Sequence, residues 1–125
     1  MKVLRVQNAY HVVRDMGRLR SFYESFLGLP LKFADGDRWT QYGVQEVNFS
    51  LSSVEEAARG SAGVVVVFEV DRLDGAEELL AAEGGRVVDR RDMGSHGQVL
   101  TFADPEGNVA QLFCRNHVAV TTAET

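Results

Sequence analysis

Apolar residues recur at helical spacing in one early stretch of the chain. Four of them occupy positions i, i+3, i+4 and i+7 of a single stripe: Leu19, Phe22, Tyr23 and Phe26. Asp15 precedes the stripe as a candidate N-cap, and Gly28 follows it as the glycine just past a helix end. Because Pro30 cannot continue a helix, the pattern predicts one helix between Asp15 and Gly28.

The same pattern returns 57 residues later in the chain. Five pairs of positions share this offset: Val13 and Val70, Leu19 and Ala76, Phe22 and Leu79, Tyr23 and Leu80, Gly28 and Gly85. A strand end, an amphipathic stripe and a terminal glycine that recur at constant spacing indicate a duplicated supersecondary unit.

A strand is expected over residues 3–13, and three extended segments follow each predicted helix. These segments are Leu31–Asp35, Arg38–Tyr42 and Gln45–Leu51 in the first half, and Arg86–Arg90, Gln98–Ala103 and Asn108–Cys114 in the second. Each half therefore reads β-α-β-β-β. We expect an α+β fold of two tandem βαβββ modules, whose curved sheets surround a shared cavity that takes the ligand.

The boundaries divide a single 125-residue domain into module one (3–52), a linker (53–63), module two (64–115) and a frayed tail (116–125). The linker opens on Ser53 followed three residues later by Glu56, which has the form of a capping box. A short helical turn is therefore predicted at its start.

Charge and composition narrow the range of partners. Thirteen Lys and Arg against eighteen Asp and Glu give a net charge of -5, which disfavours nucleic acid. The longest apolar run, Val64–Phe68, falls far short of the roughly 20 residues of a membrane span, and no secretory signal is evident. The single Cys114 excludes an internal disulfide. We expect a cytoplasmic protein that binds neither membrane nor nucleic acid.

Several short motifs resemble the vicinal oxygen chelate superfamily, which includes glyoxalase I, extradiol dioxygenases, fosfomycin-resistance enzymes and bleomycin-resistance proteins. In the first half the motifs are Val13-Arg14-Asp15, Phe22-Tyr23-Glu24 and Leu27-Gly28-Leu29. In the second they are Phe68-Glu69-Val70 and the run Phe-Ala-Asp-Pro-Glu-Gly-Asn at 102–108. The resemblance implies the fold expected above, a small-molecule ligand and a homodimer.

The resemblance also implies a divalent metal held by His, Glu or Gln at up to four positions. In this chain those positions fall at Asn8, Ser50, Val65 and Gln111. Valine cannot ligate, and neutral Asn or Ser binds a divalent ion poorly. We therefore expect no metal and no cofactor, as in a member similar to the bleomycin-resistance branch.

Seven residues are expected to bind the ligand from the cavity walls: Asn8, Tyr10, Trp39, Asn48, Ser50, Gln111 and Phe113. Gln41 joins them if its strand keeps the alternation, whereas His11 should point toward the helix. Amides, hydroxyls and aromatic faces suit an uncharged, planar or polycyclic organic molecule. Trp39 and Phe113 have the alternative of being ordinary core or dimer-interface residues.

Two titratable residues are the candidates for catalysis. Glu69 is a lone carboxylate in a neutral wall, suited to proton abstraction, or else a strand-end residue that reaches water. His96, in the loop Gly-Ser-His-Gly at 94–97, is either a general acid or base or an exposed turn residue.

Three functions are consistent with these observations. The first is metal-independent binding of a small organic molecule, as in antibiotic sequestration. The second is a lyase, isomerase or cyclase that uses Glu69 and His96. The third, a metal-dependent glyoxalase or dioxygenase, needs ligands that the sequence does not supply.

Overall fold

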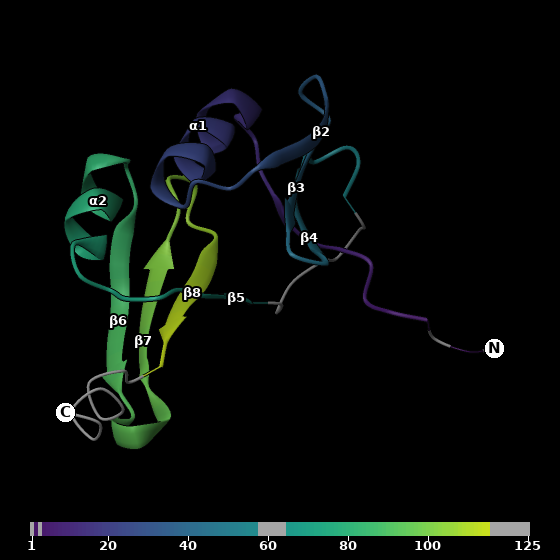
Figure 1. Ribbon diagram of the computed structural model, residues 1–125. Helices are drawn as coiled ribbons and strands as arrows, with labels where there is room; N and C mark the ends of the chain where they lie inside the picture. Colours follow the sequence, from purple (N-terminus) through teal and green to yellow (C-terminus); the bar gives the residue numbers. More distant parts are fainter. Residues whose placement is uncertain (1, 3, 58–64, 116–125) are drawn as a thin grey trace. The chain divides into compact units, whose positions relative to one another are not determined.

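The computed structural model describes residues 2, 4–57 and 65–115. The chain divides into two compact units, unit 1 (Met1–Gly63) and unit 2 (Val64–Thr125), and each is treated by itself below. The described residues of each unit form one α-helix and one four-stranded sheet (Figure 1). Within the described ranges, neither helix is long and apolar enough to cross a membrane.

Unit 1 runs β1, α1, β2, β3, β4. Its elements are β1 (Ala9–Val12), α1 (Met16–Phe26), β2 (Leu31–Asp35), β3 (Trp39–Val44) and β4 (Val47–Ser52). The sheet order is β1-β4-β3-β2, with β1 parallel to β4 and the other pairs antiparallel.

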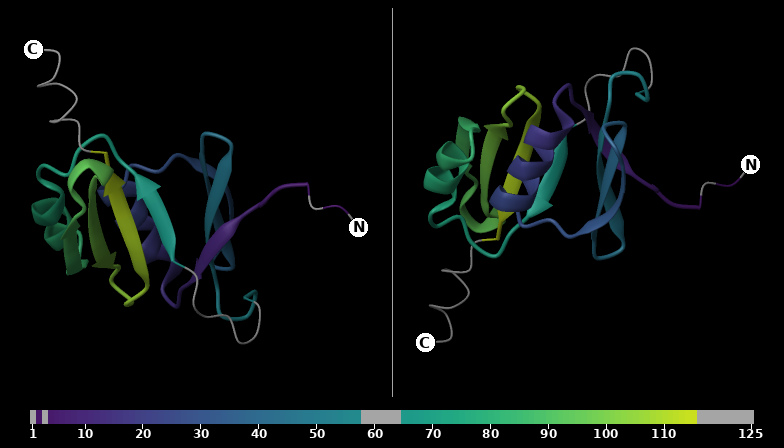
Figure 2. Two further views of the ribbon diagram at one scale, coloured as in Figure 1. Left: turned by 90° about the horizontal axis from the view of Figure 1, so that it is seen from below. Right: turned by 90° about the horizontal axis from the view of Figure 1, so that it is seen from above.

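Unit 2 repeats this order along its own stretch of chain, as the two views of Figure 2 show. Its elements are β5 (Val66–Glu69), α2 (Ala76–Ala82), β6 (Arg86–Asp92), the 3-10 turn η1 (Gly94–His96), β7 (Gln98–Ala103) and β8 (Val109–Cys114). The sheet order is β5-β8-β7-β6, and β5 is parallel to β8. The predicted pair of βαβββ modules is confirmed.

Helix α1 begins and ends at the predicted signals. The Asp15 carboxylate accepts a hydrogen bond of 3.0 Å from the backbone N–H of Arg18, as an N-cap does. Gly28, just past the helix, has φ +63°, the left-handed conformation that glycine adopts without strain. The apolar stripe faces the sheet, and Leu19, Phe22 and Tyr23 are each no more than 1% exposed.

The second helix is shorter than the duplicated pattern predicted. It starts only at Ala76, because Gly75 at φ +76° interrupts the chain just before it. The left-handed glycine at its end is Gly84, at φ +94°, and not Gly85. Leu80 alone among its residues is buried.

The first strand is also shorter than expected. It covers Ala9–Val12, and residues 4–8 carry no strand, whereas residue 3 lies outside the described residues. Ala9 pairs with Phe49, so the chain before Ala9 soon passes the start of β4 at Val47. Strand pairing, and not apolar alternation, sets where β1 begins.

Two turns follow the sequence motifs. In the turn at 104–108, Asp104 accepts 2.9 Å hydrogen bonds from the backbone N–H groups of Glu106 and Asn108, and Gly107 has φ +88°. In the linker, the Glu56 backbone N–H donates to Ser53 Oγ at 3.3 Å, within a turn over residues 54–56. Residues 58–64 and the predicted tail 116–125 lie outside the described residues.

Candidate functional site

Strand alternation in unit 1 separates a helix face from a second face that carries most predicted ligand-binding residues. Thr40, Tyr42 and Phe49 point toward α1 and are buried. The residues between them point the opposite way. We call this second side the amide face; it is formed by Asn8, Tyr10, Trp39, Gln41, Asn48 and Ser50.

A chain of hydrogen bonds joins four side chains of the amide face. Ser50 Oγ donates to Asn8 Oδ1 at 2.9 Å, and Asn8 Nδ2 donates to Gln41 Oε1 at 3.3 Å. The indole N–H of Trp39 donates to the same Gln41 oxygen at 3.2 Å. Since these bonds fix which way each amide points, the side chains present a defined polar surface.

One end of the amide face is aromatic. The rings of Tyr10 and Trp39 meet edge to face, with centroids 5.4 Å apart and an interplanar angle of 63°. Ser50, which pairs with both Tyr10 and Gln41, is fully buried beside them. Because the serine side chain is small, the larger side chains of Tyr10 and Gln41 on either side of it form the surface here.

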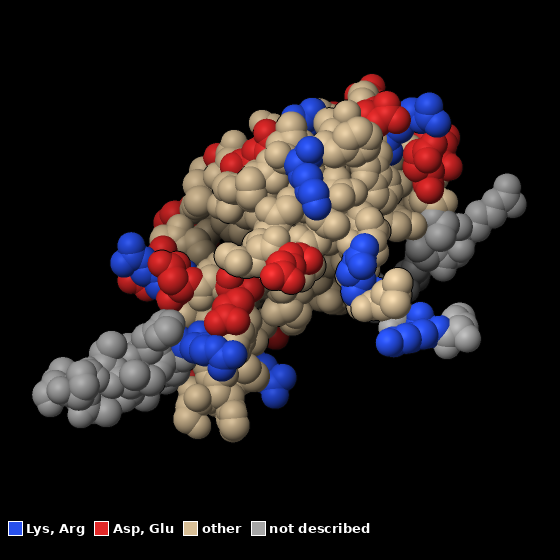
Figure 3. Space-filling model, turned by 45° about the vertical axis from the view of Figure 1, so that its right-hand side comes forward, with Lys and Arg blue, Asp and Glu red and all other residues tan. Residues whose placement is uncertain are grey.

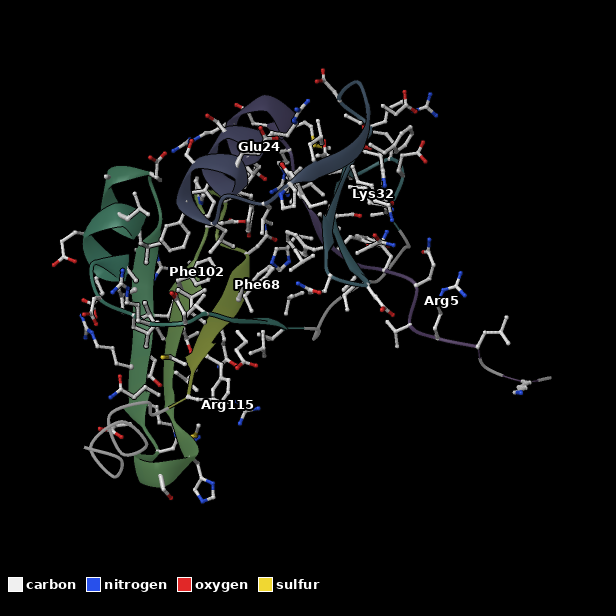
Figure 4. All side chains as sticks on the ribbon, in the orientation of Figure 1. Arg5, Glu24, Lys32, Phe68, Phe102 and Arg115 are labelled. Carbon is white, nitrogen blue, oxygen red and sulfur yellow. The ribbon has the colours of Figure 1, made fainter. Side chains whose placement is uncertain are left out.

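The other end of the amide face is cationic. The pairing of β2 with β3 shifts register between Leu31 and Phe33, which marks a β-bulge. The bulge places Lys32 and Phe33 on the same side of the sheet, where Lys32 Nζ donates to Asn48 Oδ1 at 3.0 Å. Figure 4 labels Lys32 among the strands of unit 1. Asn48 in turn donates to the backbone oxygen of Gln7 at 3.0 Å.

His11 lies on the helix face of unit 1, as the alternation predicted. It is 7% exposed, and its ring centroid lies 5.4 Å from that of Phe49 and 6.2 Å from that of Tyr23. Its role in the structure is packing against α1.

In unit 2, Gln111, Phe113 and Glu69 share the face opposite α2. Gln111 pairs with Val67, and its amide donates to Thr101 Oγ1 at 3.0 Å. Glu69 pairs with Phe113 at the end of β5 and is 56% exposed. Its carboxylate binds the Arg115 guanidinium at 3.2 Å, and that guanidinium lies 5.6 Å from the Phe113 ring centroid.

His96 is exposed in η1, the turn between β6 and β7. The turn packs closely on the end of β8, because a Cβ on Gly97 would lie 2.5 Å from the Cys114 carbonyl oxygen. In the described part of the chain no hydrogen bond joins His96 to Glu69. The structure thus places both residues in unit 2 without bringing them into direct contact.

The residues at the four positions where the resemblance implied a metal, Asn8, Ser50, Val65 and Gln111, are all uncharged. Asn8 and Gln111 are neutral amides, and their side chains hydrogen-bond to Ser50 and Thr101. Val65 has no donor atom. Among the residues that the structure describes, no three His, Cys, Asp or Glu side chains gather as metal ligands do. This neutral donor set does not fit a divalent cation.

A cavity of about 380 Å³ lies elsewhere in unit 2, between α2 and strands β6 and β7. Leu73 and Leu100 contribute its apolar lining, and Glu77 and Arg90, which form an ion pair, contribute charge. None of the predicted site residues lines this cavity. Arg91, Asp92 and Gln98 complete its polar lining.

Sequence reasoning missed Lys32 and Phe33 as members of the amide face. A β-bulge depends on how two strands pair, so the alternation within β2 alone gives no signal of it. Figure 3 shows acidic and basic side chains interspersed over the visible face of the molecule, without an extended basic surface.

The structure resembles several solved structures of one superfamily. A glyoxalase/bleomycin resistance protein/dioxygenase family enzyme from Burkholderia phytofirmans PsJN matches with a TM-score of 0.75 and 14% identity, over 87% of this chain and 97% of that one. A glyoxalase-related enzyme from Fulvimarina pelagi matches with a TM-score of 0.73 and 16% identity, over 90% and 89%. The fosfomycin resistance protein FosX from Mesorhizobium loti matches with a TM-score of 0.67 and 15% identity, over 97% and 99%.

At these identities the structural likeness establishes the fold alone. No curated protein gives a significant sequence match. A sequence profile of the Glyoxalase-like domain, however, matches residues 8–113, which is most of the chain and includes both modules. The protein belongs to the glyoxalase-like family within the vicinal oxygen chelate superfamily.

Proposed function

We propose that this protein binds a small, planar organic molecule on the amide face without a metal. The observation that carries the proposal is the chain of hydrogen bonds that joins Ser50, Asn8, Gln41 and Trp39. Ser50 and Asn8 occupy two of the four positions where the resemblance implied a metal ligand. These hydrogen bonds already hold the side chains in fixed orientations. Binding a ligand therefore costs less free energy for the ordering of side chains.

The amide face offers both kinds of contact that an aromatic ligand needs. Tyr10 and Trp39 present ring surface, and the Gln41 amide nitrogen is left outside the hydrogen-bonded chain as a donor. Binding without turnover is sequestration, the first of the functions that the sequence allowed.

The test uses Trp39, which is the single tryptophan of the chain and so gives one indole N–H signal in a proton–nitrogen spectrum. Titration with a set of bicyclic aromatic compounds is expected to shift this signal. A Gln41→Ala variant should weaken binding about tenfold through loss of a hydrogen-bonding partner. A Gln98→Ala variant, which removes an exposed amide of unit 2, is the matched control. Binding that leaves the Trp39 signal unmoved would refute the proposed site.

An acid–base enzyme is the second candidate function. It is favoured by one observation, that Glu69 shares a face with Gln111 and Thr101 in unit 2. Once a turnover is found, Glu69→Gln and His96→Ala should each lower kcat at least a hundredfold if they act as base and acid. Retention of turnover in both variants removes this function. An Arg115→Gln variant breaks the ion pair with Glu69 but keeps the Glu69 carboxylate, so it shows whether the ion pair itself affects kcat.

The homodimer and the cytoplasmic location expected from the sequence stay predictions. Sedimentation at several protein concentrations tests the first, and fractionation of the producing cell tests the second.

A further inference from the structure

We infer that the ligand of the amide face is an aromatic anion, whose charged group is bound by Lys32. This inference rests on the proposed function and adds a charge to a ligand that the sequence alone predicted to be neutral. The sequence pointed to a neutral ligand because nothing placed Lys32 on this face.

The first support is the position of Lys32. Its alkyl chain lies over Gly43, since a Cβ added there would come within 3.4 Å of Lys32 Cδ. The ammonium group thereby reaches Asn48, in the strand next to β3. A glycine at 43 leaves the space that the lysine chain occupies, and the bulge turns Lys32 toward it.

The second support is the charge around Lys32. The ion pairs Arg20–Glu24, Arg38–Glu56, Arg90–Glu77 and Arg115–Glu69 do not include Lys32, and no described carboxylate lies within 4.0 Å of its ammonium group. Its recorded partner is the neutral amide oxygen of Asn48. An ammonium group has three N–H donors, and Asn48 accepts one of them. The remaining donors and the full positive charge are available to an anionic oxygen.

The third support is the order of chemistry along the face. The aromatic pair at Trp39 lies at one end, the amide of Gln41 lies in the middle, and Lys32 lies at the other end beside Asn48. Trp39 and Gly43 are four residues apart on β3, which corresponds to about 13 Å along a strand. A bicyclic aromatic system with an anionic substituent can contact the rings and approach the lysine at once.

The experiment compares three compounds with the same ring system: 2-naphthoate, 2-naphthyl phosphate and the neutral 2-naphthamide. Affinities come from calorimetry, and the Trp39 indole signal confirms the site. We expect the anions to bind about tenfold more tightly than the amide at low ionic strength, as a charge-assisted hydrogen bond provides. This preference should decline as salt is added. A larger gain for the carboxylate or for the phosphate identifies the natural anionic group, and both results support the inference.

Variants connect the preference to the residue. Lys32→Met should abolish the preference for anions while it leaves 2-naphthamide binding unchanged, and Lys32→Arg should retain most of it. Arg18→Met removes one positive charge from an exposed position on α1 and should leave the preference intact. Because Lys32 is exposed, its substitution should not disturb folding.

The outcomes separate the two proposals. If all three compounds shift the Trp39 signal with equal affinity, or if Lys32→Met keeps the preference for anions, the inference is overturned and the proposed binding function stands. If none of the three shifts the signal, both are overturned.

Discussion

The hydroxyl of Ser50 in β4 donates a 2.9 Å hydrogen bond to the side-chain oxygen of Asn8, the residue just before the parallel strand β1. These are two of the four positions at which the resemblance to the superfamily implied metal ligands. Here one neutral side chain satisfies the other. The pair keeps the amide face polar and ordered without the charge that would attract a cation.

We predict that Ser50→Ala destabilises the protein by about 1 kcal/mol, because the half-buried Asn8 loses its donor. The Trp39 indole signal should shift as well, through the connection by Asn8 and Gln41. Urea denaturation and a proton–nitrogen spectrum measure the two effects. Ser21→Ala, at an exposed position of α1, should produce neither.

Two adjacent leucines of α2 provide a matched test of the core of unit 2. Leu80 is fully buried, whereas Leu79 is 41% exposed. Leu80→Ala should therefore cost about 2–5 kcal/mol of unfolding free energy, and Leu79→Ala less than about 1 kcal/mol. Both substitutions replace leucine with alanine in the same helix, so they change helix propensity equally. The difference between their unfolding free energies, measured by denaturation, therefore reports burial. Equal losses would contradict the packing of α2 described above.

The turn at 104–108 should depend on the carboxylate of Asp104. This carboxylate accepts hydrogen bonds from two backbone N–H groups and from the Asn108 side chain, each at 2.9 Å, and Asp104 is only 3% exposed. Asp104→Ala is expected to destabilise by about 3 kcal/mol, since buried donors lose a charged partner. Asp37→Ala, in an exposed turn, is the control in the same denaturation assay.

The Tyr42 phenol should make the stability of the protein depend on pH in alkaline solution. Burial, together with its hydrogen bond to Glu24 at 2.9 Å, raises the pKa of the Tyr42 phenol far above its ordinary value of 10.0. The unfolded chain releases this proton at lower pH than the folded chain does. The contribution of Tyr42 is therefore complete below pH 10 and is lost as the pH rises toward the folded pKa.

Tyr42→Phe should accordingly lower stability at neutral pH, and its stability should decline less steeply than that of the wild type above pH 10. Urea denaturation over a series of alkaline pH values measures the two slopes. Parallel slopes would show that Tyr42 ionises as it does in the unfolded chain.

The sequence predicted the parts of the fold that depend on single residues or on local spacing. Asp15 caps the start of α1, Gly28 follows its end, and Asp104 accepts the hydrogen bonds of the predicted turn. Strand alternation correctly placed His11 on the helix face and not on the amide face. These features follow from local geometry. A reader of the sequence alone can find them.

Features that depend on strand pairing were not predictable in the same way. The start of β1 is set by the start of β4, and the exposure of Lys32 on the amide face is set by a register shift. The short α2 likewise follows from the left-handed conformation of Gly75. The sequence shows the glycine but not the conformation that it adopts. Binding by the seven predicted ligand residues and catalysis by Glu69 and His96 stay predictions.

The β-bulge of β2 has a counterpart in β6, where the register shifts between Val87 and Asp89. Each module thus has one place where the alternation of its strand is interrupted, so that two neighbouring residues can face the same side of the sheet. In module one the residues there are Lys32 and Phe33, and in module two they are Val88 and Asp89. The two modules therefore share this irregularity of the backbone and differ in the charge it carries, which is positive in module one and negative in module two.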